Sequence, residues 1–549
     1  MVKKFKKSNC ANKVHRFINI KNPIALLLFS GLFIILTAFL FSQSRVSEFF
    51  PEIYDWEDEV TPPPSDDWIK HMPSGYVPEA LPSHVVRTAY VIPSNRTMQD
   101  NAIEKLRYMV LMYQDWCREQ MERNRFSSKT FLYETEADGI TPKINVVYAP
   151  NTDDYYRTDP WTRVAQACQN AGLPIWSSGQ VWMITYEAHV MNPDGSITGG
   201  FNGGATWGSG SDGGVGMTCA CTLALVTPED LIDDRNYDGL IVPELGPYPM
   251  KYLVTAAWYD GNTISSLSSV DHGIFIHETS HGFYLWHDFR NDSNFDGNMM
   301  GNGFRGVRGW VHPDRYPDNE FRLEYGDALA LNVNRYFNAS QVFTDNVKPT
   351  ASILTTGYVD PVNGLLEIRF TASDASGLAL VFLRLDGNTI GEMHLQGTSV
   401  DKTFQTTYYT PGQNNSYAVT VYDIQGNTQN ATATINPNTG FNRAPVPFLR
   451  IKPSKVIQGE SITLDATRST DPNSNYPLMV EWDLNGDEVF DTPPSTVLTY
   501  TTQFNEVGTR LIRARLTDSL GAQTISTAIG VRVVELVTGV FEDNWAFYE

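Results

Sequence analysis

The pattern of the sequence changes at about residue 345. Before this point, strand-like runs such as VVRTAYVI (85–92) alternate with helical stripes such as the one in 98–121. After it, short strands follow one another between turns, and helical spacing nearly vanishes. The first pattern predicts an α/β or α+β domain and the second predicts β-sandwiches. We therefore expect a multidomain chain, with an α/β (α+β) domain at 85–342 and two all-β immunoglobulin-like sandwiches at 345–437 and 443–536.

The N-terminal region has the features of an export signal. Residues 1–22 carry seven basic side chains and no acidic one, and the apolar run PIALLLFSGLFIILTAFLF follows them. Nineteen apolar-dominated residues can cross a ~30 Å hydrocarbon core, and a basic flank stays in the cytoplasm. We expect an N-terminal transmembrane helix, as an uncleaved signal anchor or else a cleaved signal peptide. The segments are a cytoplasmic basic segment (1–22), the apolar segment (23–42), a stalk or pro-segment (43–84) and a C-terminal tail (537–549).

Charge and cysteine content limit the partners of the exported part. The whole chain has a formal net charge of −21, and an acidic chain is poorly suited to nucleic acid, which needs clustered Lys and Arg. Cys117, Cys168, Cys219 and Cys221 follow the apolar run, where disulfides persist. We expect one or two structural bridges, with the pairing left open. Metal binding by Cys219 and Cys221 is less favoured, because no second cysteine pair matches them.

The residues that carry chemistry lie in DHGIFIHETSHGFYLWHDFR (271–290). His277, Glu278 and His281 form an H-E-x-x-H pentad. On a helix, residues four apart share a face, so both imidazoles can reach one Zn²⁺. Glu278 projects beside the ion, where a carboxylate acts as a general base towards water.

A catalytic zinc needs a third protein ligand. His287 lies ten residues after His277, and Asp288 follows it. This run resembles the H-E-x-x-H-x-x-G-x-x-H-D pattern of the metzincin zinc peptidases, over about residues 85–342. The resemblance implies that His287 is the third ligand. It also implies that Met300, with Met299 as the other candidate, belongs to a methionine turn beneath the metal.

One position departs from the family pattern. The family glycine would fall at residue 284, where this chain has Tyr284. The turn there tends to need a positive φ, which costs a bulky residue of order 1 kcal/mol. Gly282 offers an earlier end to the helix. The path to His287 is therefore open to question, and Glu320 or Glu324 in a later segment would be the third ligand in a gluzincin-like arrangement.

Acidic loops suggest calcium. Three stretches have alternating oxygen side chains of the D-x-N-x-D form that begins an EF-hand-type loop. None has the glutamate expected at loop position twelve, so an ordinary Asx-rich turn is the alternative. The candidate ligands are Asp234, Asn236 and Asp238; Asp292, Asn294 and Asp296; and Asp483, Asn485 and Asp487.

The two β-rich modules resemble known extracellular domains. GESITLDATRSTDPN (459–473) and VEWDLNGDEVFDT (480–492) are similar to PKD domains, and ASDASGL (372–378) with VYDIQGNT (421–428) is similar to bacterial immunoglobulin-like repeats. The resemblance implies that these modules act as spacers or as surfaces for a cell-surface polysaccharide or protein, without chemistry of their own.

Two functions of different classes follow. The first is an extracellular or cell-surface zinc endopeptidase that takes protein or peptide substrates, with Zn²⁺ and with Ca²⁺ as a candidate second ion. The chain would be anchored in the membrane by its N-terminal helix, or secreted if that segment is cleaved. The alternative is a cell-surface adhesion or polysaccharide-binding protein with a structural or degenerate zinc site.

Overall fold

The computed structural model describes residues 84–535, except 176, 178, 192–196, 199, 201, 207–209, 211, 237–262 and 340. The predicted membrane segment, the stalk up to residue 83 and the C-terminal tail lie outside the described residues. Within the described part of the chain, no helix combines the length and the apolar character needed to span a membrane.

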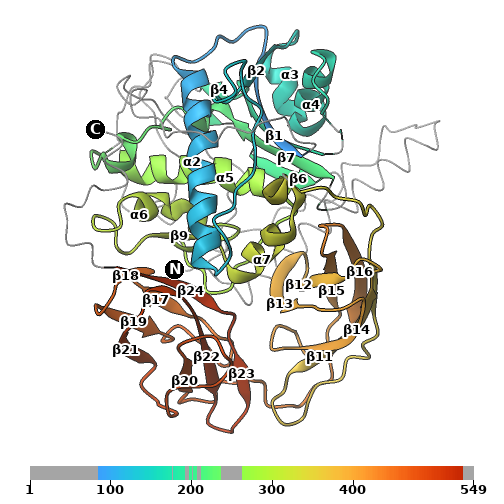
Figure 1. Ribbon diagram of the computed structural model, residues 1–549, viewed down its shortest axis with the longest axis vertical. Coiled ribbons are helices and arrows are strands. Elements are labelled where there is room, and N and C mark those ends of the chain that lie inside the picture. The colour runs from blue at the N-terminus through green and yellow to red at the C-terminus, as the bar shows by residue number, and fades with distance from the viewer. Residues whose placement is uncertain are drawn as a thin grey trace, which may run out of the picture.

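A five-stranded sheet forms the centre of the N-terminal domain (Figure 1). The strand order is β2 (Ile144–Tyr148), β1 (Val85–Ile92), β3 (Gln180–Tyr186), β7 (Gly213–Cys219) and β6 (Gly203–Thr206). The first four strands are parallel, whereas β6 runs antiparallel to β7 at the edge. This edge strand, Gly203–Thr206, lies in a glycine-rich part of the sequence.

Helices cover both faces of this sheet. Successive side chains of β1 point to opposite faces, as the period of a strand requires. Val86 and Tyr90 pack with α2 (Ala102–Arg123) and α5 (Ile264–Gly282) in one core cluster. Ala89 and Val91 pack in another with α3 (Asp153–Thr158) and α4 (Pro160–Asn170). The result is a three-layer α/β/α arrangement, which resolves the predicted α/β or α+β domain to α/β.

Short elements complete this domain. Among them, helix α7 (Tyr325–Val333) follows strand β9 (Glu320–Arg322) and leads into a 3-10 turn after Asn334. The other bounds are β4 (Val190–Met191), β5 (Ile197–Thr198), η2 (Ala220–Leu223), η3 (Asp230–Ile232), β8 (Asp296–Asn298), η4 (Asn302–Gly306), α6 (Val307–Val311), β9 (Glu320–Arg322), α7 (Tyr325–Val333) and η5 (Arg335–Asn338).

Two β-sandwiches follow, as the alternating strands predict. We call residues 350–435 the first sandwich and residues 450–534 the second sandwich. In each, two sheets share one apolar core. The first sandwich contains β10 (Thr350–Ile353), β11 (Leu366–Ser373), β12 (Leu378–Leu385), β13 (Asn388–His394), β14 (Ser399–Thr406), β15 (Asn415–Asp423) and β16 (Thr428–Ile435). The second contains β17 (Arg450–Lys452), β18 (Lys455–Ile457), β19 (Ser461–Asp465), β20 (Met479–Asp483), β21 (Thr499–Gln503), β22 (Gly508–Thr517), β23 (Gln523–Ile525) and β24 (Ile529–Val534).

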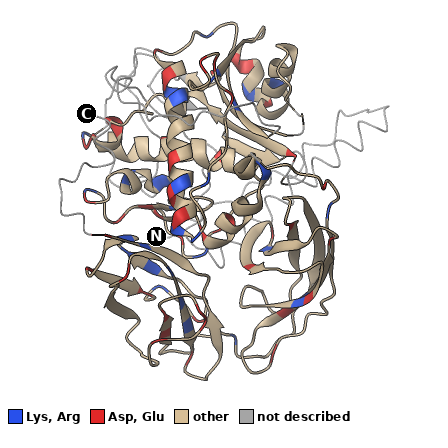
Figure 2. Cartoon of the chain, viewed as in Figure 1, with Lys and Arg blue, Asp and Glu red and all other residues tan. Residues whose placement is uncertain are grey.

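Both sandwiches pack against the N-terminal domain instead of trailing behind it (Figure 1). Arg123 at the end of α2 donates to the Gly530 carbonyl of the second sandwich at 2.7 Å. Tyr422 of the first sandwich donates to the Tyr284 carbonyl just after α5 at 3.2 Å. Basic and acidic residues are interspersed along α2 and the sandwich strands (Figure 2).

Candidate metal centre and active site

Helix α5 carries the pentad and is fixed at its start by a capping box. The Thr263 hydroxyl accepts a hydrogen bond from the Ser266 amide at 3.2 Å, and the Ser266 hydroxyl accepts one from the Thr263 amide at 3.1 Å. This reciprocal pairing satisfies donors that the first turn would otherwise leave open.

Glycines let the edge of the sheet approach α5 closely. A Cβ added to Gly204 of β6 would lie 2.2 Å from the Glu278 carbonyl oxygen and 2.6 Å from His281 Cβ. One added to Gly216 of β7 would lie 2.4 Å from the Thr279 amide nitrogen. No side chain fits into such distances. The glycine-rich sequence is therefore what seats the pentad helix directly against β6 and β7.

The helix ends at Gly282 in a Schellman motif. The amide of Tyr284 donates to the His281 carbonyl at 3.0 Å, and the amide of Leu285 donates to the Ser280 carbonyl at 3.3 Å. Tyr284 occupies the position that glycine usually takes and has φ = 71°. The turn that the family pattern requires is thus made by a tyrosine.

This turn brings a third histidine to the pentad. Nε2 of His287 lies 3.3 Å from Nε2 of His277. Ligand nitrogens of His277, His281 and His287 all lie within 4.8 Å of one another. Two nitrogens on a tetrahedral zinc with bonds of about 2.05 Å lie about 3.3 Å apart. The spacing of these imidazoles therefore fits a shared zinc ion.

The outer ring nitrogens of two histidines are held by the backbone. His277 Nδ1 lies 2.7 Å from the Met299 carbonyl oxygen, and His281 Nδ1 lies 2.9 Å from that of Leu285. A carbonyl accepts, so each Nδ1 is the donor and each Nε2 is left with its lone pair for a metal. These contacts fix the tautomer that ligation needs.

Electrostatics keep the three rings neutral. Burial lowers the pKa of His281 to about 4 and that of His287 to about 3, from an ordinary 6.5. Burial, with the neighbouring His281 and His287, holds the pKa of His277 well below that value. Only neutral imidazole binds a metal, so the rings are in their ligating form near pH 7. His277 and Glu278 are buried, whereas His281 and His287 are half-buried.

The segment with Met299 and Met300, the expected methionine turn, links His277 to the residue after His287. The Met299 carbonyl holds His277, and the Met300 carbonyl accepts from the Asp288 amide at 3.0 Å. Both methionines are fully buried in the same core as α5. A role for Met300 as the apolar floor of a metal site stays a prediction.

The glutamates considered as alternative ligands have other partners. Glu320 pairs with Arg123 at 2.6 Å and with Arg322 at 2.9 Å. Glu324 pairs with Arg322 at 2.9 Å. Among the described residues neither joins the histidine cluster. The geometry favours His287 over both.

The acidic loops proposed for calcium make contacts within the chain. Asp292 accepts from the amides of Asn302 and Gly303, Asn294 accepts from Arg305, and Asp296 pairs with Arg450 and Lys452 of the second sandwich. The loop between His287 and the methionine turn is thus ordered by the chain's own donors.

The other two loops behave alike. Asp234 pairs with Arg315 and accepts from Tyr316, Asn236 bridges to Thr263, and Asp238 lies outside the described residues. Asp483 accepts three amides of its own turn, and Asn485 and Asp487 accept further amides there, as in an Asx-rich turn. Calcium binding at all three loops stays a prediction.

Two clusters that local sequence patterns did not mark are brought together by the fold. Asp345, Asp374 and Asp423 gather oxygens within 4.8 Å at the first sandwich. They lie far apart in the sequence, so no local spacing identifies them. Acidic groups alone do not define a cation site.

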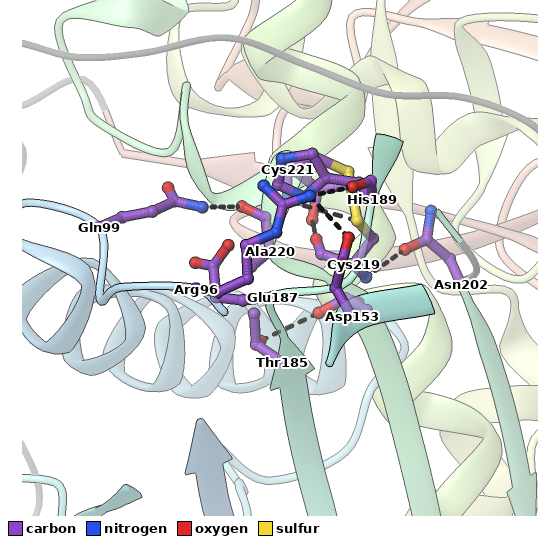
Figure 3. Close-up of a disulfide and its surroundings, with 12 residues drawn as sticks. Arg96, Gln99, Asp153, Thr185, Glu187, His189, Asn202, Cys219, Ala220 and Cys221 are labelled. Atoms are coloured by element: carbon purple, nitrogen blue, oxygen red, sulfur yellow. Dashed lines mark hydrogen bonds and ion pairs between the residues drawn. A yellow bond between two sulfur atoms is a disulfide. The ribbon is translucent and has the colours of Figure 1, made fainter. Parts of the chain in front are cut away.

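The second cluster joins His189 to Cys219 and Cys221, at the carboxyl ends of β3 and β7 (Figure 3). The two sulfurs form a disulfide with each other, which confirms the expectation of a structural bridge. They are therefore not thiolate ligands here. His189 is fully buried, and burial lowers its pKa to about 3, so the ring packs as a neutral group. Cys117 and Cys168 are buried thiols.

Comparisons with known proteins give no identification. No family model matches the chain, and no curated protein matches it. Among solved structures, catalytically inactive OgpA from Akkermansia muciniphila, in complex with an O-glycopeptide, is similar at 12% identity and a TM-score of 0.43, covering 69% of this chain and 98% of that one. Wild-type OgpA is similar at 12% identity and a TM-score of 0.41, covering 66% of this chain and 98% of that one. Fibronectin(III)-like modules of Clostridium thermocellum CbhA are similar at 11% identity and a TM-score of 0.16, covering 34% of this chain and 95% of that one. TM-scores this low establish neither a shared fold nor an activity.

Proposed function

We propose that this protein is a zinc-dependent endopeptidase whose active site is built from His277, His281, His287 and Glu278. The observation that carries the proposal is the 3.3 Å separation of two Nε2 atoms, one on His277 of the helix that also carries Glu278 and one on His287 in the segment after that helix. Three neutral imidazoles with one open position are the donor set of a catalytic zinc.

The residues of the chain divide the work. When bound, zinc supplies Lewis-acid activation of water and of the scissile carbonyl. Glu278 follows His277 on the helix and takes the proton of the attacking water, then delivers it to the leaving amine. Its burial keeps bulk water from competing for that proton. His277 and His281 are fixed by backbone carbonyls, so the site needs little rearrangement before reaction.

The edge strand β6 offers a place for an extended substrate. β6 pairs with β7 on one side and, among the described residues, is the last strand of the sheet. Its residue Gly204 lies directly against Glu278 and His281. A peptide that adds to the sheet along β6 would run beside the histidines, held by main-chain hydrogen bonds. We propose this edge as the substrate-binding strand.

The test compares the full-length chain with its Glu278→Gln variant. We expect the variant to retain one zinc per chain and to lose hydrolysis of casein, whereas His281→Ala should lose the zinc as well. A chelator should stop hydrolysis by the unaltered protein, and added zinc should restore it. Peptide hydrolysis by Glu278→Gln at the rate of the unaltered protein would refute the assignment of the base.

The substrate panel should hold an unmodified peptide and the same peptide carrying an O-linked glycan. OgpA was crystallised with an O-glycopeptide, which makes this pair worth including although that likeness is too weak to favour either substrate. Zinc binding without hydrolysis of either would favour the alternative, a surface adhesion or polysaccharide-binding protein. A polysaccharide-binding assay on the same sample would then test that alternative.

A further inference from the structure

The segment that carries the third histidine is held by the first sandwich. Residues 284–290 lead from the end of α5 to the methionine turn. Side chains or amides of β12, β13, β15 and β16 contact four of these seven residues. These contacts connect the proposed active site to a domain that sequence resemblance describes as a spacer.

The first contact fixes the tyrosine at the turn. Tyr422 donates its hydroxyl to the Tyr284 carbonyl at 3.2 Å, and Asn430 donates to the Tyr284 hydroxyl at 2.8 Å. The Asn430 side-chain oxygen accepts from Arg384 at 3.1 Å and from Thr420 at 2.7 Å, which orients its amide group. A tyrosine with φ = 71° is held where glycine would adopt this conformation unaided.

The next two contacts are made by Trp286 and by His287 itself. The Arg384 guanidinium stands 3.8 Å from the centre of the Trp286 ring. The Thr389 amide of β13 donates to the His287 carbonyl at 2.8 Å. The backbone of the third ligand itself is therefore bound to the first sandwich.

A network of ion pairs holds the end of the segment, at Arg290. Arg290 pairs with Asp288 and with Glu392 of β13, each at 2.6 Å, and all three side chains are largely buried. The other Glu392 oxygen accepts from Thr527 of the second sandwich at 2.6 Å. A buried charge network of this kind is strong only when all its members are present.

We propose that the first sandwich is part of the metal site, and that Tyr422 and Glu392 are positioning residues that orient His287 towards the ion. This inference rests on the proposed function for the identity of the ion. Without these contacts the 284–290 segment has an unfavourable turn and a buried arginine that keeps Asp288 but has lost its second carboxylate, Glu392, so His287 is expected to leave the cluster. His277 is expected to stay in place, because α5 and the Met299 carbonyl hold it. His281 stays on α5, but the Leu285 carbonyl that orients its ring belongs to the released segment.

The test uses the full-length chain in four forms: unaltered, Tyr422→Phe, Glu392→Gln and the double variant. Glu481→Gln is the matched control, since it breaks a two-bond pair with Arg515 inside the second sandwich. Zinc affinity is measured by competition with a chelator. We expect the double variant to bind zinc about 10–100-fold more weakly, as is typical when partners of metal ligands are removed. The control should bind like the unaltered protein.

Cobalt substitution separates positioning from general stability. The visible spectrum of bound Co²⁺ reports how many imidazoles coordinate it, so the double variant should resemble His287→Ala. Tyr422→Phe removes one oxygen only and keeps the ring, so it should remain folded and shift zinc affinity in the same direction. A double variant with the zinc affinity and cobalt spectrum of the unaltered protein would overturn the proposal.

The outcome is independent of peptide hydrolysis. If the unaltered protein binds zinc through three histidines but cleaves no peptide, the proposed function fails while the positioning role is still measured. If it cleaves peptides and the double variant keeps its full zinc affinity, the positioning role fails alone.

Discussion

Tyr284 offers a direct measure of the strain at the end of α5. At φ = 71° a residue with a side chain is disfavoured by about 1 kcal/mol relative to glycine. The tyrosine ring is nevertheless buried, with 3% of its surface exposed. Truncating a buried aromatic side chain costs about 3–5 kcal/mol, so both Tyr284→Ala and Tyr284→Gly should destabilise the protein.

Comparing Tyr284→Gly with Tyr284→Ala isolates the free-energy cost of the left-handed backbone conformation. Both lose the ring and the bond from Asn430, but only Ala keeps a Cβ in the left-handed conformation. Tyr284→Gly should therefore be the more stable by about 1 kcal/mol, the reverse of the order in a helix interior, where Gly is worse than Ala by roughly 0.5–1 kcal/mol. Tyr284→Phe should lose only the Asn430 bond, about 1 kcal/mol.

The assay is urea unfolding of the metal-free chain, followed by tryptophan fluorescence. Metal must be absent, because bound zinc would add its own binding free energy to the folded state. The relevant transition is the one that Tyr284→Ala shifts. If Tyr284→Gly unfolds at lower urea than Tyr284→Ala, the left-handed turn is not the conformation in solution, and the explanation of the tyrosine is wrong.

Three further results are expected. Gly204→Ala should cost about 1–3 kcal/mol of stability by pushing β6 from α5, whereas Gly391→Ala, where an added Cβ meets nothing nearer than 3.5 Å, should cost less; equal urea midpoints would contradict the close packing. The pKa of His281 is lowered from 6.5 to about 4, so the unfolded chain takes up a proton that the folded chain does not, and the metal-free protein should lose stability as pH falls from 6.5 to about 4. His281→Gln should reduce the slope of that dependence only in part, because the pKa values of His277, His287 and His189 are lowered as well; an unchanged slope would refute the prediction. Replacing Cys219 and Cys221 by Ser should lower the free energy of unfolding by only about 1.6 kcal/mol, because the disulfide closes a very short loop; a disulfide closing a 15-residue loop contributes about 3 kcal/mol. A fall in the thermal midpoint much larger than this loss implies would contradict the prediction.

Much of the fold follows from periodicity. Strand β1 and helix α2 lie where the strand-like run at 85–92 and the helical spacing at 98–121 place them. The two sandwiches follow from the repeated short strands beyond residue 345. Such patterns are local, because each depends only on which face of one element is apolar.

The histidine cluster is also visible in the sequence, for a similar reason. His277 and His281 are one helical turn apart, so helix geometry alone puts them on one face. His287 was a family expectation, which the 3.3 Å contact with His277 supports geometrically.

The sequence by itself determined the elements of this protein and the pair of imidazoles within one turn of helix. Only the tertiary structure decided the rest: that a tyrosine makes the left-handed turn, that Glu320 and Glu324 are taken by arginines, and that the first sandwich holds the segment of His287. The physical reason is distance along the chain. Tyr422 and Asn430 meet Tyr284 from more than 100 residues away, and no local pattern records a partner that only folding brings near.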